Sequence, residues 1–333
     1  MSKILMVGPA WVGDMVMAQT LFKLIRQKDP HAVMEVLAPA WSFPLLNRMP
    51  EVSAAIPLAL THGQLGLGER YRLGKSLRDC GYTQAIVLPN SWKSALVPFW
   101  AKIPKRTGWV GEGRFFLLND VRYGKSRYPL MIEQLMALGL DRGAALPSSY
   151  PYPNLIVSQD MCNASLLKQN LLVGSKPILA LCPGAEFGPS KCWPAEYFAE
   201  VARSKIKQGW QVWLFGSVKD RVIAEQIMQL TDQQCINLAG RTSLDEAIDL
   251  LSLVTSVLTN DSGLMHVAAA LQKPLIALYG STSPSFTPPL SDKARELKLN
   301  LACQPCFERT CRYQHYRCMR ELTPDQVLSM MDT

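Results

Sequence analysis

The sequence predicts an α/β protein with two doubly wound domains, each a parallel sheet flanked by helices. Three observations predict this fold class. Short apolar runs typical of buried strands alternate with amphipathic helical patterns in both halves of the chain. A proline-rich stretch at residues 146–154 separates the halves, and the alternation begins again after it. The chain has 333 residues, which is long enough for two domains.

The first half begins with a strand pattern and continues as an alternation of strands and helices. Its periodicity predicts strands at 4–7, 33–37 and 85–88 and a helix at 12–27. Two stretches lack a clear period. We expect residues 57–76 to form a loop or a short helix, and residues 104–128, which are rich in Arg, Lys, Gly and aromatic residues, to be mostly loop.

The second half repeats the alternation. Its predicted strands lie at 178–181, 212–215, 257–259 and 275–279, and its helices at 159–170, 195–207, 219–230, 244–253 and 264–271. We place the domain junction between about residues 150 and 176. The predicted division is an N-terminal domain at 1–160, a linker at 161–176, a C-terminal domain at 177–322 and a closing helix at 323–333.

The composition is that of a globular protein, with 48% hydrophobic and 19% charged residues. No apolar run reaches the ~18 residues needed to span a bilayer. The chain opens on a strand pattern rather than on the charged segment and apolar core of a signal peptide. We therefore expect a cytoplasmic protein whose nine cysteines are mostly reduced.

The net charge of +8 is unevenly distributed along the chain. Residues 1–155 hold 18 Lys and Arg against 10 Asp and Glu, which accounts for the whole excess, because the remainder is neutral. Such an excess serves solubility or attracts an anionic partner: nucleic acid, a membrane surface or an acidic glycan. Nucleic acid is disfavoured, because the sequence carries no RNA-binding aromatic motif and no DNA-reading helix signature.

The most informative motif is NDSGLMH at residues 260–266, which lies between an apolar run and a helical pattern. In an open α/β sheet, ligands bind at the carboxyl ends of strands, where such turns lie. The first N–H groups of the following helix lack internal partners and carry partial positive charge, so a diphosphate fits there. The alternative is an ordinary turn in which Asp261 or Ser262 caps the helix.

A second motif, CPGAEFGPSKCWP at residues 182–194, also follows a buried-strand pattern. Gly184 and Gly188 permit close backbone approach or a positive φ. Lys191 lies near the start of the next helix, and Pro194 suits the first turn of that helix. Two strand–loop–helix sites in one half of the chain indicate a site for a nucleotide diphosphate, although a single lysine is more often solvated.

Several motifs, taken together and in order, resemble one known family. They are GPAWVGDM at 8–15, LPNSWKSA at 88–95, RTGW at 106–109, LLNDVR at 117–122, PGAEFGP at 183–189, NDSGLMH at 260–266 and FTPPL at 286–290. The chain is similar to the ADP-heptose:lipopolysaccharide heptosyltransferases, most closely to their heptosyltransferase II group, from about residue 3 to about residue 295. The resemblance implies a GT-B type fold, in which two Rossmann-like domains face each other across a cleft.

The resemblance also implies an inverting glycosyl transfer from ADP-heptose to the first heptose of the lipopolysaccharide inner core. Such a transfer needs a base for the acceptor hydroxyl and positive groups for the departing diphosphate. Asp14 matches the base-bearing motif of the family, although its position alone also suits a helix cap. Lys191 is expected to neutralise the diphosphate. We therefore assign Asp14 and Lys191 as the catalytic pair.

The expected donor site gathers residues at several strand ends. We assign to it Gly184, Glu186, Gly216, Ser217, Asp220, Thr242, Asp261, Ser262, Gly263 and His266. The acidic contact to the ribose has an uncertain register, with Asp220 as the nearest acid. His266 is either a satisfied core residue or a phosphate contact, since a neutral imidazole still donates from one ring nitrogen. Ser243, beside Thr242, equally suits a helix N-cap.

The resemblance implies an acceptor of the heptosyl-Kdo2-lipid A type at the cytoplasmic face of the inner membrane, where the protein would be peripheral. An N-terminal acceptor domain with surplus positive charge fits such a phosphorylated lipid. We assign acceptor binding to basic residues of this half: Arg70, Arg72, Lys93, Arg106 and Arg114. No cofactor is required, because ADP-heptose is a substrate. No acidic metal-binding motif of the Asp-x-Asp kind is present, so no catalytic metal is expected.

The tail carries four cysteines in one short segment: Cys303, Cys306, Cys311 and Cys318. A Cys-x-x-Cys pair followed by two more cysteines can hold a structural metal such as zinc, although these spacings differ from a standard pair of knuckles. Free thiols and a disulfide are the alternatives.

Three other functions are left open by the sequence. The protein could be a heptosyltransferase acting at another core position, a sugar-nucleotide epimerase of the same fold, or a non-catalytic protein that binds an anionic glycolipid. The joint presence of Asp14 and Lys191 disfavours the last.

Overall fold

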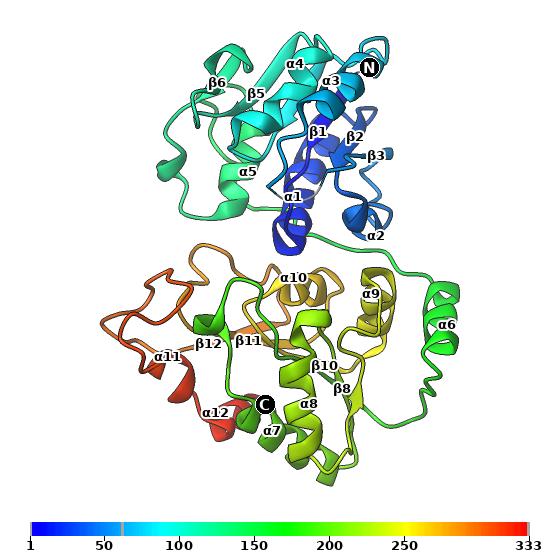
Figure 1. Ribbon diagram of the computed structural model, residues 1–333, viewed down its shortest axis with the longest axis vertical. Helices are drawn as coiled ribbons and strands as arrows, with labels where there is room; N and C mark the ends of the chain where they lie inside the picture. The colour runs from blue at the N-terminus through cyan, green and yellow to red at the C-terminus, as the bar shows by residue number, and fades with distance from the viewer. Residues whose placement is uncertain (1, 61–62, 332–333) are drawn as a thin grey trace. The chain divides into compact units, whose positions relative to one another are not determined.

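The computed structural model describes residues 2–60 and 63–331, and the chain divides into two compact units, Met1–Pro153 and Asn154–Thr333. Each unit contains one six-stranded sheet in which every neighbouring pair of strands is parallel. Figure 1 shows the units as the blue-to-green and the green-to-red parts of the chain. The α/β class with two doubly wound domains is thereby confirmed.

The first unit has the strand order β3-β2-β1-β4-β5-β6. Its strands are β1 (Lys3–Val7), β2 (Val33–Ala38), β3 (Ala54–Pro57), β4 (Gln84–Val87), β5 (Lys105–Trp109) and β6 (Asp120–Arg122). Its helices are α1 (Val12–Lys28), α2 (Phe43–Leu46), α3 (Leu67–Ser76), α4 (Leu96–Trp100) and α5 (Met131–Gly139), with 3-10 turns η1 (Ala40–Ser42), η2 (Trp92–Ala95), η3 (Arg114–Phe116) and η4 (Lys125–Arg127).

The central strands of this unit are continuous apolar runs because helices cover them. In β1 all residues after Lys3 are buried, and Leu5 packs in one cluster with side chains of β2 and β4 and of the α4 region. Helix α1 follows β1 and buries most of its length, including Leu21, which lies against α5. This packing fixes the first turn of α1 at the carboxyl end of β1.

The second unit has the strand order β12-β11-β10-β7-β8-β9. Its strands are β7 (Ile178–Cys182), β8 (Gln211–Leu214), β9 (Ile236–Asn237), β10 (Ser256–Asn260), β11 (Leu275–Tyr279) and β12 (Ala294–Lys298). Its helices are α6 (Gln159–Lys168), α7 (Ala195–Lys207), α8 (Arg221–Leu230), α9 (Leu244–Leu253), α10 (Gly263–Ala270), α11 (Arg317–Arg320) and α12 (Pro324–Met331), with 3-10 turns η5 (Pro189–Lys191) and η6 (Val218–Asp220).

Strands β7 and β11 are wholly buried, as expected for parallel strands covered on both faces. The core of this unit gathers apolar side chains of β7, β8, β10 and β11 with those of α7 and α8, around the fully buried Trp193. The indole nitrogen of Trp193 donates to the carbonyl of Leu322 (2.9 Å), which ties the C-terminal part of the chain to the loop before α7.

The two sheets share one topology. Numbered within its own unit, each sheet has the order 3-2-1-4-5-6, so the order reverses between the first and the fourth strand. These are β1 and β4 in the first unit, and β7 and β10 in the second. A doubly wound sheet binds its ligands outside the carboxyl ends of the strands at this reversal.

The predicted linker at 161–176 is wrong in its first part, because residues 159–168 form α6, which packs on α9 within the second unit. The Ser165 hydroxyl donates to Asp249 (2.8 Å), and the Gln169 amide donates to Glu246 (2.8 Å). The division lies at residues 153/154 instead of 160/161. The proline-rich stretch therefore marked the boundary better than the helix after it.

The prediction of mostly loop at 104–128 missed two strands. The segment contains strand β5, which pairs with β4 and β6, and the edge strand β6. Both are polar, with Lys105 and Arg106 in β5 and two charged residues in the three of β6, so the apolar period was absent. Residues 57–76 contain α3 at their end, while residues 61 and 62 lie outside the described part of the chain.

Within the described ranges, no helix is both long enough and apolar enough to cross a membrane.

Candidate active site

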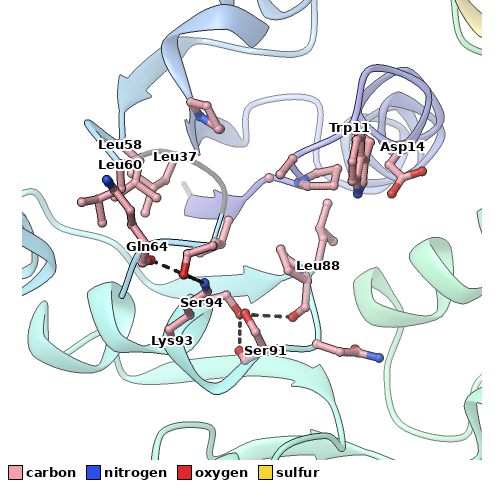
Figure 2. A pocket seen from close by; sticks show the side chains of 18 of the residues that line it. Trp11, Asp14, Leu37, Leu58, Leu60, Gln64, Leu88, Ser91, Lys93 and Ser94 are labelled. Carbon is pink, nitrogen blue, oxygen red and sulfur yellow. Dashed lines mark hydrogen bonds between the residues drawn. The ribbon is translucent and has the colours of Figure 1, made fainter. Parts of the chain in front are cut away.

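In the first unit, a cavity of about 810 Å³ opens at the carboxyl ends of β1 and β4, where the strand order reverses. Figure 2 shows Trp11 and Asp14 projecting from the start of α1, with Ser91, Lys93 and Ser94 on the segment after β4. Asp14 is the third residue of α1, and the helix N-cap is Trp11, so Asp14 lies in the first helical turn rather than in the loop. A carboxylate is favourable there, because the first turn carries partial positive charge.

Four charged side chains line this cavity: Asp14, Arg70, Lys93 and Lys125. Arg70 is buried, and its Nε donates to the carbonyl of Leu65 (2.7 Å). The Lys93 ammonium donates to the carbonyl of Gly63 (2.9 Å). Three cations against one carboxylate make the cavity electropositive, which favours a ligand that carries negative charge.

Lys125 is a cavity residue that the sequence analysis missed. Burial lowers its pKa and so does the nearby Arg114, whereas the carboxylate of Asp14 raises it. Lys125 is therefore within electrostatic range of the proposed base. It follows the polar edge strand β6, and its signal was hidden in the segment that we expected to be a loop.

Three of the predicted acceptor residues do not line the cavity: Arg72, Arg106 and Arg114. Arg114 is buried, and its guanidinium donates to the carbonyls of Pro89 (2.5 Å) and Trp109 (2.7 Å). Burial lowers the pKa of Arg114 to about 10. Because these donors hold the loop after β4, Arg114 has a structural role. Its predicted assignment to acceptor binding is therefore corrected.

Arg106 and Arg72 are also engaged elsewhere. The guanidinium of Arg106 donates to the carbonyls of Ile103 (2.6 Å) and Leu117 (2.7 Å). Arg72 is exposed and pairs with Glu69 within α3 (3.2 Å). Only Arg70 and Lys93 of the predicted set are cavity residues.

In the second unit, the corresponding strand ends bring Lys191 and Asp261 together. The Lys191 ammonium lies 2.6 Å from Asp261 Oδ2, and both side chains are largely buried. The Thr282 hydroxyl donates to the same carboxylate oxygen (2.5 Å), and the ring of Phe187 lies 4.9 Å from the ammonium. An ammonium has three N–H donors, and the ion pair with Asp261 uses one of them. Asp261 therefore holds Lys191 in place and leaves other N–H groups able to donate to a ligand.

Asn260 holds this arrangement together, a role that the sequence analysis did not assign. It is fully buried at the end of β10. Its amide donates to the carbonyl of Pro183 (2.6 Å), and its oxygen accepts from the backbone N–H of Trp193 (3.2 Å). Asn260 thus ties the loop that carries Lys191 to the turn that carries Asp261.

Helix α10 begins at Gly263, with Ser262 as its N-cap residue and no side-chain hydrogen bond at the cap. His266 is buried in the first turns of this helix, and burial lowers its pKa to about 4. Asp261 partly opposes that shift, while Lys191 adds to it. The imidazole is therefore neutral at physiological pH, and both nearby charges lie within its electrostatic range.

The remaining predicted donor residues lie at the ends of β7, β8 and β9. The Asp220 carboxylate accepts from the backbone N–H (2.7 Å) and the hydroxyl (2.8 Å) of Ser217. It lies so close to Gly184 that a Cβ there would come within 2.3 Å of Asp220 Oδ1, and Gly216 is similarly crowded. Gly184, Gly216, Ser217 and Asp220 are therefore neighbours at the ends of β7 and β8.

Glu186 and Thr242 are placed beside this group. Glu186 forms an exposed ion pair with Lys219, one residue before Asp220. The Thr242 hydroxyl is near the carbonyl of Leu238 (3.4 Å). Ser243 is the N-cap of α9, and it exchanges hydrogen bonds with Glu246 in a capping box. The alternative of a simple N-cap is thus confirmed for Ser243.

The cysteine-rich tail packs on the loop of Lys191. The backbone carbonyl of Arg309 accepts from the N–H of Ser190 (3.2 Å), and the Arg309 guanidinium lies 5.4 Å from the ring of Phe187. The N–H of Phe307 donates to the carbonyl of Ser281 (2.8 Å). All nine cysteines are free thiols, and in the described ranges no three His, Cys, Asp or Glu side chains are grouped to hold a metal ion. These contacts indicate that the tail stabilises the loop that carries Lys191.

Both units thus place charged side chains at the reversal of a doubly wound sheet, where sheets of this kind bind their ligands. A family model described as glycosyltransferase family 9 (heptosyltransferase) matches residues 70–317. The chain belongs to this family and is a glycosyltransferase.

Similar proteins indicate which group of heptosyltransferases the chain resembles. The chain is 48% identical to lipopolysaccharide heptosyltransferase 2 of Escherichia coli K12, over 99% of this chain and 97% of that protein. It is 50% identical to lipooligosaccharide heptosyltransferase 2 of Haemophilus influenzae, over 89% and 88% of the two chains. The solved structure of E. coli ADP-heptose lps heptosyltransferase II superposes with a TM-score of 0.88 at 45% identity, covering 99% of this chain and 97% of that one. This likeness confirms the GT-B type of fold.

Proposed function

We propose that the protein transfers L-glycero-D-manno-heptose from ADP-heptose to the first heptose of the lipopolysaccharide inner core, on an acceptor of the heptosyl-Kdo2-lipid A type. The observation that carries this proposal is the placement of Asp14 in an electropositive cavity at the strand reversal of the first unit. The names of the relatives support the choice of heptosyltransferase II activity.

In the proposed reaction, Asp14 accepts the proton of the acceptor hydroxyl as its oxygen bonds to the anomeric carbon of the donor. The bond from that carbon to the diphosphate oxygen breaks, and ADP leaves with the bonding electron pair. Attack from the face opposite to ADP inverts the anomeric centre. Lys191 and the first N–H groups of α10 stabilise the negative charge that develops on the diphosphate.

Asp261 acts in this scheme as a positioning residue. Its ion pair with Lys191 and its hydrogen bond from Thr282 set the direction of the ammonium before the donor arrives. A preorganised charge of this kind costs little reorganisation during the reaction. The neutral His266 is available to donate to a phosphate oxygen without adding a buried charge.

The decisive experiment measures ADP release by the purified protein with ADP-heptose and a series of truncated core lipids. We expect release with the acceptor that ends in one heptose. Release with Kdo2-lipid A alone would indicate a heptosyltransferase for another core position. Epimerised sugar nucleotide without acceptor would indicate an epimerase, and binding of glycolipid without turnover would indicate a non-catalytic protein.

We further propose that the acceptor is met at the cytoplasmic face of the inner membrane, with the protein peripheral to it. The positive balance of residues 1–155 supports this location, because anionic lipid headgroups attract a basic surface.

A further inference from the structure

One region of the first unit, built from segments that contact one another, exposes large apolar side chains to solvent. It is formed by α3, by η2 with α4, and by η3. We call it the aromatic face, and its members are Leu67, Tyr71, Trp92, Phe99, Phe115 and Phe116. Phe115 is 54% and Phe116 is 88% exposed. Two adjacent phenylalanines at such exposure are uncommon in a monomeric protein without a partner for that surface.

The three segments of the aromatic face are held together rigidly. The Tyr71 ring meets the Trp100 ring edge-on at 5.5 Å, and the Arg78 Nε donates to the carbonyl of Trp100 (3.0 Å). Gly74 allows this close approach of α3 to α4, since a Cβ there would lie 2.9 Å from the carbonyl oxygen of Val97. The opposite sides of these helices contribute to the core of the unit.

The third segment is joined to the second by two arginines. Arg114, in η3, donates to the carbonyl of Pro89, which precedes η2. Arg106 lies with its guanidinium 5.6 Å from the ring of Phe99 and donates to the carbonyl of Leu117, the residue after Phe116. The segments that carry the exposed aromatic side chains are therefore joined by these side-chain contacts.

The exposed charges around this face have a small positive excess, which adds to the positive balance of the whole first unit. Four exposed cations lie on α3 or between the end of α4 and the start of β5: Arg72, Lys75, Lys102 and Lys105. The acids there are Glu69, which pairs with Arg72, then Asp79 and Glu112, which accepts from the N–H of Trp92. Exposed aromatic rings with flanking cations are the side chains that settle at a membrane–water interface.

The aromatic face is continuous with the cavity of Asp14. On η2, Trp92 is exposed on the face while Lys93 and Ser94 line the cavity. On α3, Tyr71 is exposed while Arg70 lines the cavity. From this juxtaposition we infer that the aromatic face docks the first unit on an anionic lipid bilayer, with Phe115 and Phe116 inserted at the interface. The docking itself goes beyond the proposed transfer, and only its benefit for a lipid-linked acceptor rests on that proposal.

The test is co-sedimentation of the full chain with vesicles of equal parts phosphatidylglycerol and phosphatidylcholine. We expect the double variant Phe115→Ser, Phe116→Ser to lower the partition coefficient by about tenfold or more, because two apolar side chains no longer enter the interface. Lys102→Glu and Lys105→Glu are each expected to lower it about fivefold at low salt, and the loss should shrink as salt rises. Vesicles of phosphatidylcholine alone should bind weakly.

The matched control is Leu167→Ser, Leu172→Ser, which removes two side chains that are 78% and 89% exposed in the second unit. It should bind vesicles like the unchanged protein. Equal binding by the Phe115→Ser, Phe116→Ser variant, or an equal loss in the control, overturns the inference. So does a change in self-association, by sedimentation velocity, without a change in vesicle binding, which would make the face an interface between copies.

Transfer assays separate this inference from the proposed function. The Phe115→Ser, Phe116→Ser variant should be slower with acceptor embedded in vesicles and unchanged with the acceptor freed of its acyl chains. If the unchanged protein binds vesicles through this face but transfers to neither acceptor, the proposed function fails and the docking surface stands.

Discussion

At the scale of single residues, the charged side chains assigned to the reaction follow equivalent strands of the two sheets. Asp14 follows the first strand of its sheet, Lys191 follows the first strand of the other, and Asp261 follows the fourth. The chain places each in a turn that must leave the sheet and enter a helix. Backbone N–H groups at such turns are already unpaired, so charged ligands meet little competition there.

The substitution Asp14→Asn should lower the rate of transfer by about 100- to 10,000-fold, because the amide cannot accept the hydroxyl proton. ADP affinity should stay near that of the unchanged protein, since Lys191 and Asp261 belong to the other unit. Turnover with saturating substrates and calorimetry with ADP check the two statements. A variant that keeps more than about a tenth of the turnover would show that Asp14 is not the base.

The substitution Lys191→Ala should weaken ADP and ADP-heptose binding by about 10- to 150-fold, the loss of a charge-assisted contact worth about 1.5–3 kcal/mol. It should slow the reaction as well, because charge grows on the leaving diphosphate. Lys207→Ala is the control, since Lys207 is an exposed lysine of α7 in the same unit. Unchanged ADP affinity together with intact turnover would remove Lys191 from the site.

Residue types alone could not tell a binding arginine from a structural one. The sequence predicted five basic acceptor residues, and the cavity contains two of them, Arg70 and Lys93. Arg114 is buried, and it contacts the nearby Trp109 as well as Pro89, which is 25 residues away along the chain and is brought near only by the folded sheet. No local pattern records such contacts. The places of Asp14 and Lys191 at strand ends were predictable because each follows a recognisable strand, whereas the roles assigned to them rest on the resemblance to the family.

At the scale of elements, apolar runs located the central strands, whereas charge hid the edge strands β6 and β12. Strand β7 reads as five consecutive apolar residues, whereas β6 consists of Asp120, Val121 and Arg122. An edge strand pairs on one side only and tolerates charge on its exposed side, so its sequence lacks the expected period. Helix α6 was predicted as a helix, but its assignment to a unit required the contacts with α9.

Close packing of α3 on α4 predicts opposite effects at two glycines of α3. Gly74→Ala should destabilise the protein by about 1–3 kcal/mol, because the new Cβ would lie 2.7 Å from Trp100 Cβ and 2.9 Å from a backbone oxygen. Gly68→Ala meets nothing within 4 Å and should be neutral or stabilise by up to about 1 kcal/mol, as alanine favours helix.

Shifts of the urea midpoint of unfolding check both substitutions. Equal shifts for Gly74→Ala and Gly68→Ala would mean that helix propensity outweighs the packing of α3 on α4. Because the aromatic face depends on that packing, Gly74→Ala should also weaken vesicle binding, and Gly68→Ala should not.

At the scale of the whole molecule, the chain separates its charge by unit. The excess of +8 lies in residues 1–155, whereas the remainder is neutral although it carries the proposed site for a diphosphate. In the proposed site, a small number of groups contact the diphosphate directly: Lys191, the N–H groups at the start of α10 and neutral His266. A large acidic glycolipid is instead attracted by a broad basic surface, which acts over longer range and is sensitive to salt.

This separation predicts that acceptor and donor kinetics respond differently to charge and salt. Lys93→Gln should raise the acceptor KM by about tenfold, the loss of one charge-assisted contact of about 1.5 kcal/mol, and should leave the ADP-heptose KM unchanged. The effect should diminish as ionic strength rises, because exposed charges are screened over ~8–10 Å. Lys207→Gln, which removes an exposed lysine of the second unit, should change neither constant.

Steady-state kinetics at low and moderate salt check the prediction. Equal damage to both substrates, or an acceptor KM that does not depend on salt, would mean that the positive charge of the first unit serves only solubility.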